Sequence, residues 1–180
     1  MELVYEKECG WGERTFSLAA MNGHLGNMKW LREKKCPWDK DTFTWACING
    51  DLGNMEWLYE NKCPWSAHVF AWSAYYGELD NMEWLLEKDC PWDEDTFAWA
   101  AYVGDLDIMK WLFEKRCPWD EEAFNHAASN GNIVNMKWLY EKGCPWECEA
   151  LLSYLAQFLF SRREHPPLDA CQWAGPEEQL

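Results

Sequence analysis

The sequence predicts an all-α solenoid, in which short units of two helices stack one after another along the chain. Two observations carry this prediction. A unit of 27 residues recurs without a gap through most of the 180 residues, and a fixed period of about 20 to 50 residues is the sequence signature of repeat architectures. Within the units, apolar residues recur at helical spacing, and no unit contains the alternating β-branched run that would predict a sheet.

The period is most visible in cysteine and tryptophan. Cysteine recurs every 27 residues, and tryptophan follows two positions later. The cysteines of this series are Cys9, Cys36, Cys63, Cys90, Cys117 and Cys144. With each cysteine taken as position 1, position 8 is Phe, position 15 is Gly and positions 22 and 23 are Trp-Leu in every complete repeat. The predicted organisation is an array over 1–160, with a half-repeat 1–8, repeats 9–35, 36–62, 63–89, 90–116 and 117–143 and a capping helix 144–160, followed by a loosely ordered tail 161–180.

Each repeat is expected to contain two helices, separated by the glycine at position 15. Position 4, just after Pro-Trp, holds residues that cap helix N-termini: Asp39, Ser66, Asp93 and Asp120. The glycine ends the first helix, because it readily takes the left-handed conformation found after helix C-termini. Position 16 offers a cap for the second helix, as Asp51, Asp105 or Asn132. The proline at position 2 stops the second helix from continuing.

The two ends of the array depart from the repeat. Residues 1–8 align with the second half of a repeat, so we expect the chain to begin inside a second helix, without a polar capping repeat. Residues 147–160 keep a helical pattern but are almost continuously apolar, which predicts a C-terminal cap.

The repeats resemble ankyrin repeats. The stretch from Leu18 to Leu31, LAAMNGHLGNMKWL, is similar to the ankyrin pattern L-A-A-x-x-G-H-L-x-x-V-x-x-L, and the residues from Asp41 to Cys47 occupy the place of the ankyrin T-P-L-H-x-A-A. Ankyrin repeats have about 33 residues, whereas these have 27. The missing residues correspond to the place where ankyrin repeats build a β-hairpin. The chain thus resembles the short ankyrin variant with a Cys-Pro-Trp-Asp junction, found in large DNA viruses of protists and in some algae. This resemblance implies an ankyrin-like solenoid that lacks β-hairpins.

Charge and composition exclude several classes of partner. Sixteen basic residues face 31 acidic ones, for a formal net charge of −15. Such a surface repels phosphate backbones and anionic lipid, so we expect neither a nucleic acid nor a membrane as partner. The chain starts without the basic and apolar segments of a secretory signal. We therefore expect an intracellular, cytoplasmic monomer, located in the host cytoplasm if the source is viral.

The periodic cysteines predict buried free thiols. Equivalent positions of stacked repeats lie about a helix-packing distance of 10 Å apart, whereas a disulfide needs Cα atoms within about 7 Å. Cys144, Cys148 and Cys171 form the only cluster in the sequence, and no histidine with metal-site spacing accompanies them. None of the four histidines has a partner at catalytic spacing, and no glycine-rich phosphate loop occurs. We therefore expect no catalytic residue, cofactor or metal.

Two tryptophan ladders run along the array. The ladder at position 22 comprises Trp30, Trp57, Trp84, Trp111 and Trp138, and we expect it in the interior, bridging one repeat to the next. The ladder at position 3, which includes Trp38, is also interpreted as core. The alternative for both is a stacking platform for bases or sugars.

The binding face is predicted from positions 13 and 14, which vary while their neighbours do not. The resemblance to ankyrin proteins implies that these positions line a concave groove. The candidate partner-binding residues are Ile48, Asn49, Tyr75, Tyr76, Tyr102 and Val103, with the acidic residues Asp93, Glu94 and Asp95 at a helix start. The predicted function is binding of a protein partner with a basic rim, without catalysis. The alternatives are a structural or truncated fragment of a longer ankyrin/F-box-type adaptor and, third, an enzyme.

Overall fold

The computed structural model describes residues 11–147, and these residues form helices joined by short turns, with no strand in that range. The first helices of the repeats are α2 (Glu13–Met21), α4 (Lys40–Asn49), α6 (Ala67–Tyr76), α8 (Glu94–Val103) and α10 (Glu121–Ser129). The second helices are α3 (Leu25–Glu33), α5 (Leu52–Glu60), α7 (Leu79–Glu87), α9 (Leu106–Glu114) and α11 (Ile133–Glu141). The predicted all-α repeat solenoid without hairpins is confirmed. The half-repeat 1–8, most of the capping helix and the tail lie outside the described residues.

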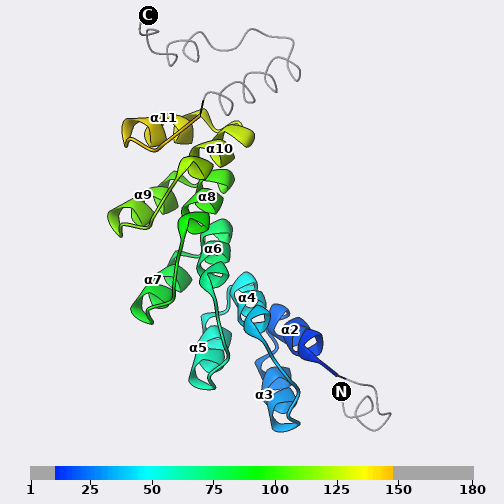
Figure 1. Cartoon of the computed structure of the whole chain (residues 1–180). Coiled ribbons are helices and arrows are strands. Elements are labelled where there is room, and N and C mark those ends of the chain that lie inside the picture. Colours follow the sequence, from blue (N-terminus) through cyan, green and yellow to red (C-terminus); the bar gives the residue numbers. More distant parts are fainter. Residues whose placement is uncertain (1–10, 148–180) are drawn as a thin grey trace, which may run out of the picture.

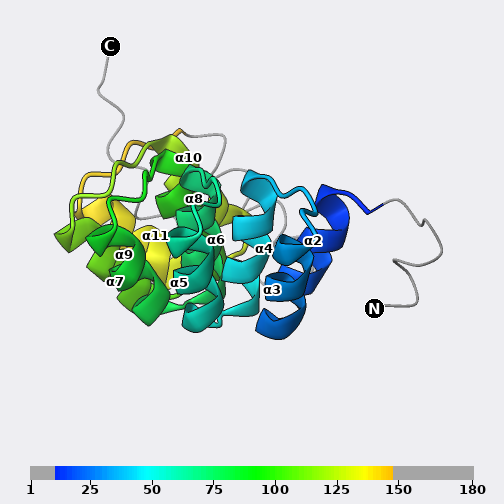
Figure 2. The ribbon, with the colours of Figure 1, turned by 90° about the horizontal axis from the view of Figure 1, so that it is seen from below.

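The repeats form a curved stack with the first helices on the inner side (Figure 1). Each first helix packs against the first helix of the next repeat, whereas each second helix packs mainly on the first helix of its own repeat. The helices follow one another in chain order from α2 to α10 (Figure 2). Small residues at positions 11 and 12, such as Ala100 and Ala101, are fully buried. They let neighbouring first helices approach closely, and this one-sided contact makes their side concave.

The core is a ladder of phenylalanines, one from position 8 of each first helix. All five are at most 1% exposed: Phe16, Phe43, Phe70, Phe97 and Phe124. Met and Leu from positions 20 and 23 of the second helices, for example Met55 and Leu58, are equally buried. The junction tryptophan of the next repeat covers each phenylalanine, with ring centroids 5.1 Å apart for Phe16 and Trp38 and 5.0 Å apart for Phe97 and Trp119. The junction ladder is therefore half-buried and joins one repeat to the next.

The position 22 ladder is only partly interior. Trp84 is 8% exposed and contacts the rings of Phe43 in α4 and Tyr59 in α5. The other four tryptophans of this ladder are half-buried and pack against the core from outside. The prediction of a buried bridge holds for Trp84 and is too strong for its equivalents, part of whose rings stays exposed. The Nζ atoms of Lys34 and Lys115 lie 5.9 and 5.7 Å from the ring centroids of Trp30 and Trp111.

Helix caps follow the prediction at most positions. The Asp39 carboxylate accepts from the backbone N–H of Thr42 at 3.1 Å, within a capping box. The side chains at position 16 cap the second helices as expected for Asp51, Asp105 and Asn132. The prediction is wrong for Ser66 and Asp93, whose side chains cap no backbone N–H of α6 or α8. Ser66 Oγ instead lies 3.4 Å from His68 Nδ1.

Second helices end in a left-handed residue that is rarely glycine. Position 27 has a positive φ in every described repeat: Lys35, Lys62, Asp89, Arg116 and Gly143, with φ between 55° and 80°. At the end of α9, the backbone N–H of Arg116 donates to the Phe113 carbonyl at 3.0 Å, and the backbone N–H of Cys117 donates to the Leu112 carbonyl at 2.9 Å. This is the Schellman pattern, in which glycine is the preferred residue. Four repeats thus carry a strained side chain where the fifth has glycine.

Replacing Arg116 with glycine should stabilise the array. A non-glycine residue loses about 1–2 kcal/mol in the left-handed region, and the greater backbone freedom of unfolded glycine offsets part of this gain. We expect Arg116→Gly to raise the free energy of unfolding by about 0.5–1 kcal/mol, measured by urea denaturation. The matched reverse change, Gly143→Arg, should lower it. If both changes shifted the free energy of unfolding in the same direction, a non-glycine residue at position 27 would not be strained.

Truncating the buried tryptophan should cost much more than truncating an exposed one. We expect Trp84→Ala to lower the free energy of unfolding by about 3–5 kcal/mol, because it leaves a cavity between α4, α5 and α7. Trp45→Ala, at a side chain 37% exposed, is the control and should cost far less. Chemical denaturation followed by circular dichroism measures both. An unchanged midpoint for Trp84→Ala would mean that this ring does not join the repeats.

Candidate functional site

The inner face of the stack carries a groove. A hollow of about 600 Å³ lies between α4, α6 and α8. Its lining residues are Asp41, Thr44, Trp45, Ile48, His68, Ala71, Trp72, Tyr76, Asp95 and Trp99. A second hollow of about 420 Å³ lies between α2 and α4 and shares Asp41 and Trp45 with the first. The groove therefore runs across successive first helices.

Beside the first hollow, six rings form an aromatic cluster, which consists of Trp72, Tyr75, Tyr76, Trp99, Tyr102 and His126. Trp72 and Trp99 stack with centroids 6.1 Å apart and planes inclined by 15°. Tyr75 and Tyr102 stack in the same way, at 6.4 Å and 16°. The ring of His126 lies 5.3 Å from that of Trp99 and 5.9 Å from that of Tyr102. The cluster thus extends across α6, α8 and α10 as a continuous surface.

Helix geometry explains why these residues meet. Positions 10, 13 and 14 are three and four residues apart, so they share one face of each first helix. Positions 8, 11 and 12 point to the core and leave this face to the groove. Tyr76 and Tyr102 are 47% and 36% exposed. Large aromatic side chains on this exposed face are not required by the packing of the repeat.

The sequence-predicted residues fall in three places. Tyr75, Tyr76 and Tyr102 belong to the aromatic cluster, and Tyr75 is the one that stacks on Tyr102. Ile48 and Asp95 line the first hollow.

The other predicted residues lie apart from the hollow. Val103 is 40% exposed near the end of α8, and Glu94 is exposed in its first turn. Asn49 lies against Gly23 of the preceding repeat. Asp93 sits at the N-cap position with Oδ1 buried and without a hydrogen-bond partner among the described residues. Neither Asn49 nor Asp93 is placed to contact a ligand in the hollow.

Sequence reasoning missed the largest contributors to the groove, the tryptophans at position 10. Trp45, Trp72 and Trp99 all line the first hollow. No functional role was predicted for them or for His126, which occupies the same position. The signal that identifies them is their spacing of three residues from position 13, which puts both positions on one helix face.

The row of rings at position 10 is interrupted between α4 and α6, where Trp45 does not contact Trp72. A pair of polar side chains lies at this interruption. Cys47 Sγ lies 2.8 Å from Ser73 Oγ where these helices meet. The equivalent pair in the next contact is Ala74 and Ala100, and α4 and α6 contact each other less extensively than the other neighbouring first helices do. The bulkier pair holds the two helices further apart, and the first hollow lies over this wider junction.

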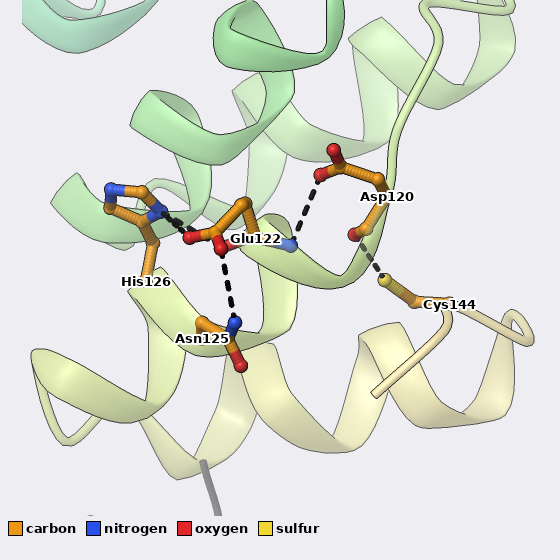
Figure 3. A network of polar contacts seen from close by, with 5 residues as sticks. All are labelled: Asp120, Glu122, Asn125, His126 and Cys144. Atoms are coloured by element: carbon orange, nitrogen blue, oxygen red, sulfur yellow. Dashed lines mark hydrogen bonds and ion pairs between the residues drawn. The ribbon is translucent and has the colours of Figure 1, made fainter. Parts of the chain in front are cut away.

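His126 takes part in a polar network at the end of the cluster (Figure 3). Its Nδ1 lies 2.8 Å from the carbonyl oxygen of Glu122 and 3.7 Å from Oε2 of the same residue. The Glu122 backbone N–H donates to Asp120 Oδ1 at 3.0 Å. The thiol of Cys144 donates to the Asp120 carbonyl at 3.3 Å and not to the histidine. The network therefore orients the imidazole at the end of the aromatic cluster and does not build a thiol–imidazole pair.

The periodic cysteines that the structure describes are buried and free, as predicted: Cys36, Cys63, Cys90, Cys117 and Cys144. Cys47, which lies outside this series, is also buried and free. Several donate to a backbone carbonyl of the preceding repeat, as Cys63 Sγ does to Asp39 at 3.6 Å. Burial raises the pKa of Cys63, Cys90, Cys117 and Cys144 from an ordinary value of 9.0 to about 12. Thiols with such a pKa are protonated at neutral pH and therefore poor nucleophiles. Within residues 11–147, no group of three or more His, Cys, Asp or Glu side chains could hold a metal ion.

Comparison with solved structures identifies the fold. The structure is similar to the crystal structure of the human ASB11 ankyrin repeat domain, with a TM-score of 0.59 and 19% sequence identity, over 84% of this chain and 83% of that one. The chain has an ankyrin-like fold. No family model matches the sequence, and no curated protein matches it. At this identity the likeness shows the fold and nothing finer.

In the described part of the array, no helix is both long and apolar enough to cross a membrane. The exposed aromatic cluster and the adjoining hollow are the features of this array that packing does not explain.

The buried thiols should resist modification until the array opens. At about pH 8, we expect a thiol reagent to label Cys63, Cys90 and Cys117 more than about a hundredfold more slowly in native protein than in urea, because a pKa of about 12 leaves little thiolate. Since the folded pKa lies above the unfolded one, these thiols stabilise the fold fully below pH 9.0, and this contribution is lost as the pH rises towards about 12. Mass spectrometry of labelled peptides measures each site, and rapid native labelling would contradict their burial.

Proposed function

We propose that the array binds a protein partner through its concave face and catalyses no reaction. The single observation that carries this proposal is the aromatic cluster, which presents tyrosine and tryptophan rings on α6 and α8 and continues to His126 on α10. Tyrosine and tryptophan are the residues most enriched at the energetic centres of protein interfaces. The repeat does not need them there, because Leu18 occupies position 10 in the first repeat and Ser129 occupies position 13 in the fifth.

The charge around the groove indicates the character of the partner. Asp41 and Asp95 line the first hollow, Glu94 and Glu122 are exposed in the first turns of α8 and α10, and the whole chain carries a formal charge of −15. A partner with an apolar anchor and a basic rim complements this surface. Charge complementarity of this kind accelerates association, and added salt slows it.

The finer identity of the chain is part of this proposal. The period of 27 residues and the Cys-Pro-Trp-Asp junction resemble the short ankyrin variant of large DNA viruses of protists and some algae. The free cysteines suit a reducing, intracellular location, which is the host cytoplasm if the source is viral. We further propose that the array acts as a monomer, with the concave face left free for the partner.

Removing two tyrosines from the cluster should abolish binding without unfolding the array. We expect Tyr76→Ala/Tyr102→Ala to lower the affinity for a partner captured by the wild-type chain by at least about a hundredfold, because each ring contributes as an interface anchor. The melting temperature and helical signal should change little, since both side chains lie off the buried face. Surface plasmon resonance measures the affinity and shows whether the on-rate falls with salt.

The second helices supply a matched control for this experiment. Phe113 and Tyr140 are 38% and 46% exposed, close to the values for the two groove tyrosines. Phe113→Ala/Tyr140→Ala should leave the affinity within about twofold of the wild type, because these rings lie on the second helices, outside the proposed interface. If the control weakens binding as much as the groove variant does, the site is not on the concave face. Unfolding of the groove variant would show that the tyrosines are structural.

A further inference from the structure

We infer that the hollow between α4, α6 and α8 binds the guanidinium group of an arginine side chain presented by the partner. This inference rests on the proposed function and specifies the chemistry of one contact within it. It is drawn from three features of the hollow: the uncovered ring of Trp45, two carboxylates without partners among the described residues, and an opening wide enough to admit a side chain.

The tryptophan rings of the hollow lack a cation that similar rings elsewhere in the array possess. On the outer side, the guanidinium of Arg32 lies 4.0 Å from the ring centroid of Trp38, and Lys88 Nζ lies 6.0 Å from that of Trp84. Comparable lysine contacts occur over Trp30 and Trp111. No cation of residues 11–147 covers the rings of Trp45, Trp72 or Trp99 in this way. Trp72 and Trp99 are partly covered by each other and by Tyr76 and His126, whereas no described ring contacts that of Trp45, so its face remains available to a cation from outside the chain.

Two carboxylates complete the environment of a cation. Asp41 at the start of α4 and Asp95 at the start of α8 line the same hollow. Both are exposed, and within the described part of the chain neither carboxylate accepts a hydrogen bond or forms an ion pair. Their contribution to α4 and α8 is limited to a favourable charge at the helix N-terminus. A hydrogen-bonding cation placed against the tryptophans would find acceptors on two different helices.

The hollow is large enough and open enough for a side chain. Its volume of about 600 Å³ lies within the range of about 300–1,000 Å³ typical of ligand pockets. Of the described rings, none contacts that of Trp45, whereas Trp72 and Trp99 stack directly. The interruption in the row of rings at position 10 lies above the Cys47–Ser73 pair, which spaces α4 from α6. Tyr76 also stacks on Trp72, with ring centroids 6.0 Å apart, so a planar group can stack on the uncovered ring of Trp45.

Arginine fits this combination better than the other biological cations. Its guanidinium is planar, so it stacks on an indole face while its N–H groups point outward in the ring plane towards carboxylates. A lysine ammonium is strongly hydrated and compact, and a quaternary ammonium needs aromatic faces but donates no hydrogen bond. A quaternary ammonium would leave Asp41 and Asp95 without a donor, and a lysine ammonium can donate to them but does not stack flat on an indole ring. His68, the remaining polar lining residue that bears a ring, is exposed and leaves the carboxylates accessible.

The test is a titration of the full chain with N-acetyl-arginine amide, followed by nuclear magnetic resonance of the tryptophan indole N–H groups. We expect the signals of Trp45 and Trp72 to shift, while those of Trp30 and Trp111 on the outer side do not. N-acetyl-citrulline amide has nearly the same shape but no charge, and it should bind at least about tenfold more weakly, because the charge-assisted hydrogen bonds and the cation–π contact are lost.

Charge-matched variants separate the site from the overall acidity of the chain. Asp41→Asn/Asp95→Asn should weaken binding of N-acetyl-arginine amide at least about tenfold. Glu56→Gln/Glu83→Gln removes the same number of charges from exposed positions of α5 and α7 and should change binding less than about twofold. Signals assigned through single Trp→Phe variants identify the rings that respond.

Several results would overturn the inference. They are equal binding of the arginine and citrulline amides, equal loss in the two charge variants, tighter binding of N-acetyl-trimethyllysine amide, or no shift at Trp45 and Trp72. Failure here is distinguishable from failure of the proposed function. If the arginine amide does not bind but Tyr76→Ala/Tyr102→Ala still abolishes partner binding, the concave face is the interface and only the arginine contact is wrong. If the arginine amide binds but Tyr76→Ala/Tyr102→Ala leaves partner binding unchanged, the hollow binds a guanidinium group but the concave face is not the interface with the partner.

Discussion

The close packing of consecutive first helices through small side chains is the constraint on which the rest of the structure depends. Alanines at positions 11 and 12, such as Ala100 and Ala101, are fully buried where these helices meet. A side chain without a γ atom lets two helices approach closely, whereas the second helices, which carry Trp-Leu, remain further apart. The difference in spacing curves the stack, and the curvature turns positions 10, 13 and 14 towards a common groove.

Aromatic rings serve two opposite purposes in this array, and their surroundings distinguish them. On the outer side and at the junctions, rings close the gap between repeats, as Trp38 does over Phe16. Lysine and arginine side chains cover the exposed parts of several of these rings. In the groove, rings stack on each other and on His126, and carboxylates lie nearby in place of cations. An aromatic surface left open beside negative charge has the composition of a recognition surface.

One local departure from the repeat connects packing to the shape of the groove. The Cys47–Ser73 pair replaces the alanines of the other contacts, and its Sγ–Oγ distance of 2.8 Å shows that the two larger side chains meet directly. The pair is buried and satisfied, so it is compatible with stability, yet it widens the junction above which the first hollow forms. Among the described first helices, the contact between α4 and α6 is thereby the least extensive.

The sequence by itself determined the 27-residue period, the two-helix unit, the phenylalanine core and the buried cysteines, because a strict period places the same residue type in the same environment each time. It also identified the face that holds Tyr75, Tyr76 and Tyr102, since variation in a repeated frame marks positions free of packing. Only the tertiary structure decided that Trp45, Trp72 and Trp99 belong to that face. A recurring large residue suits a core and a groove equally well, and the side it faces depends on the curvature that neighbouring helices impose. The left-handed residues at position 27 were hidden for a related reason: Lys, Asp and Arg there reveal no conformational requirement until the chain path into the next repeat is known.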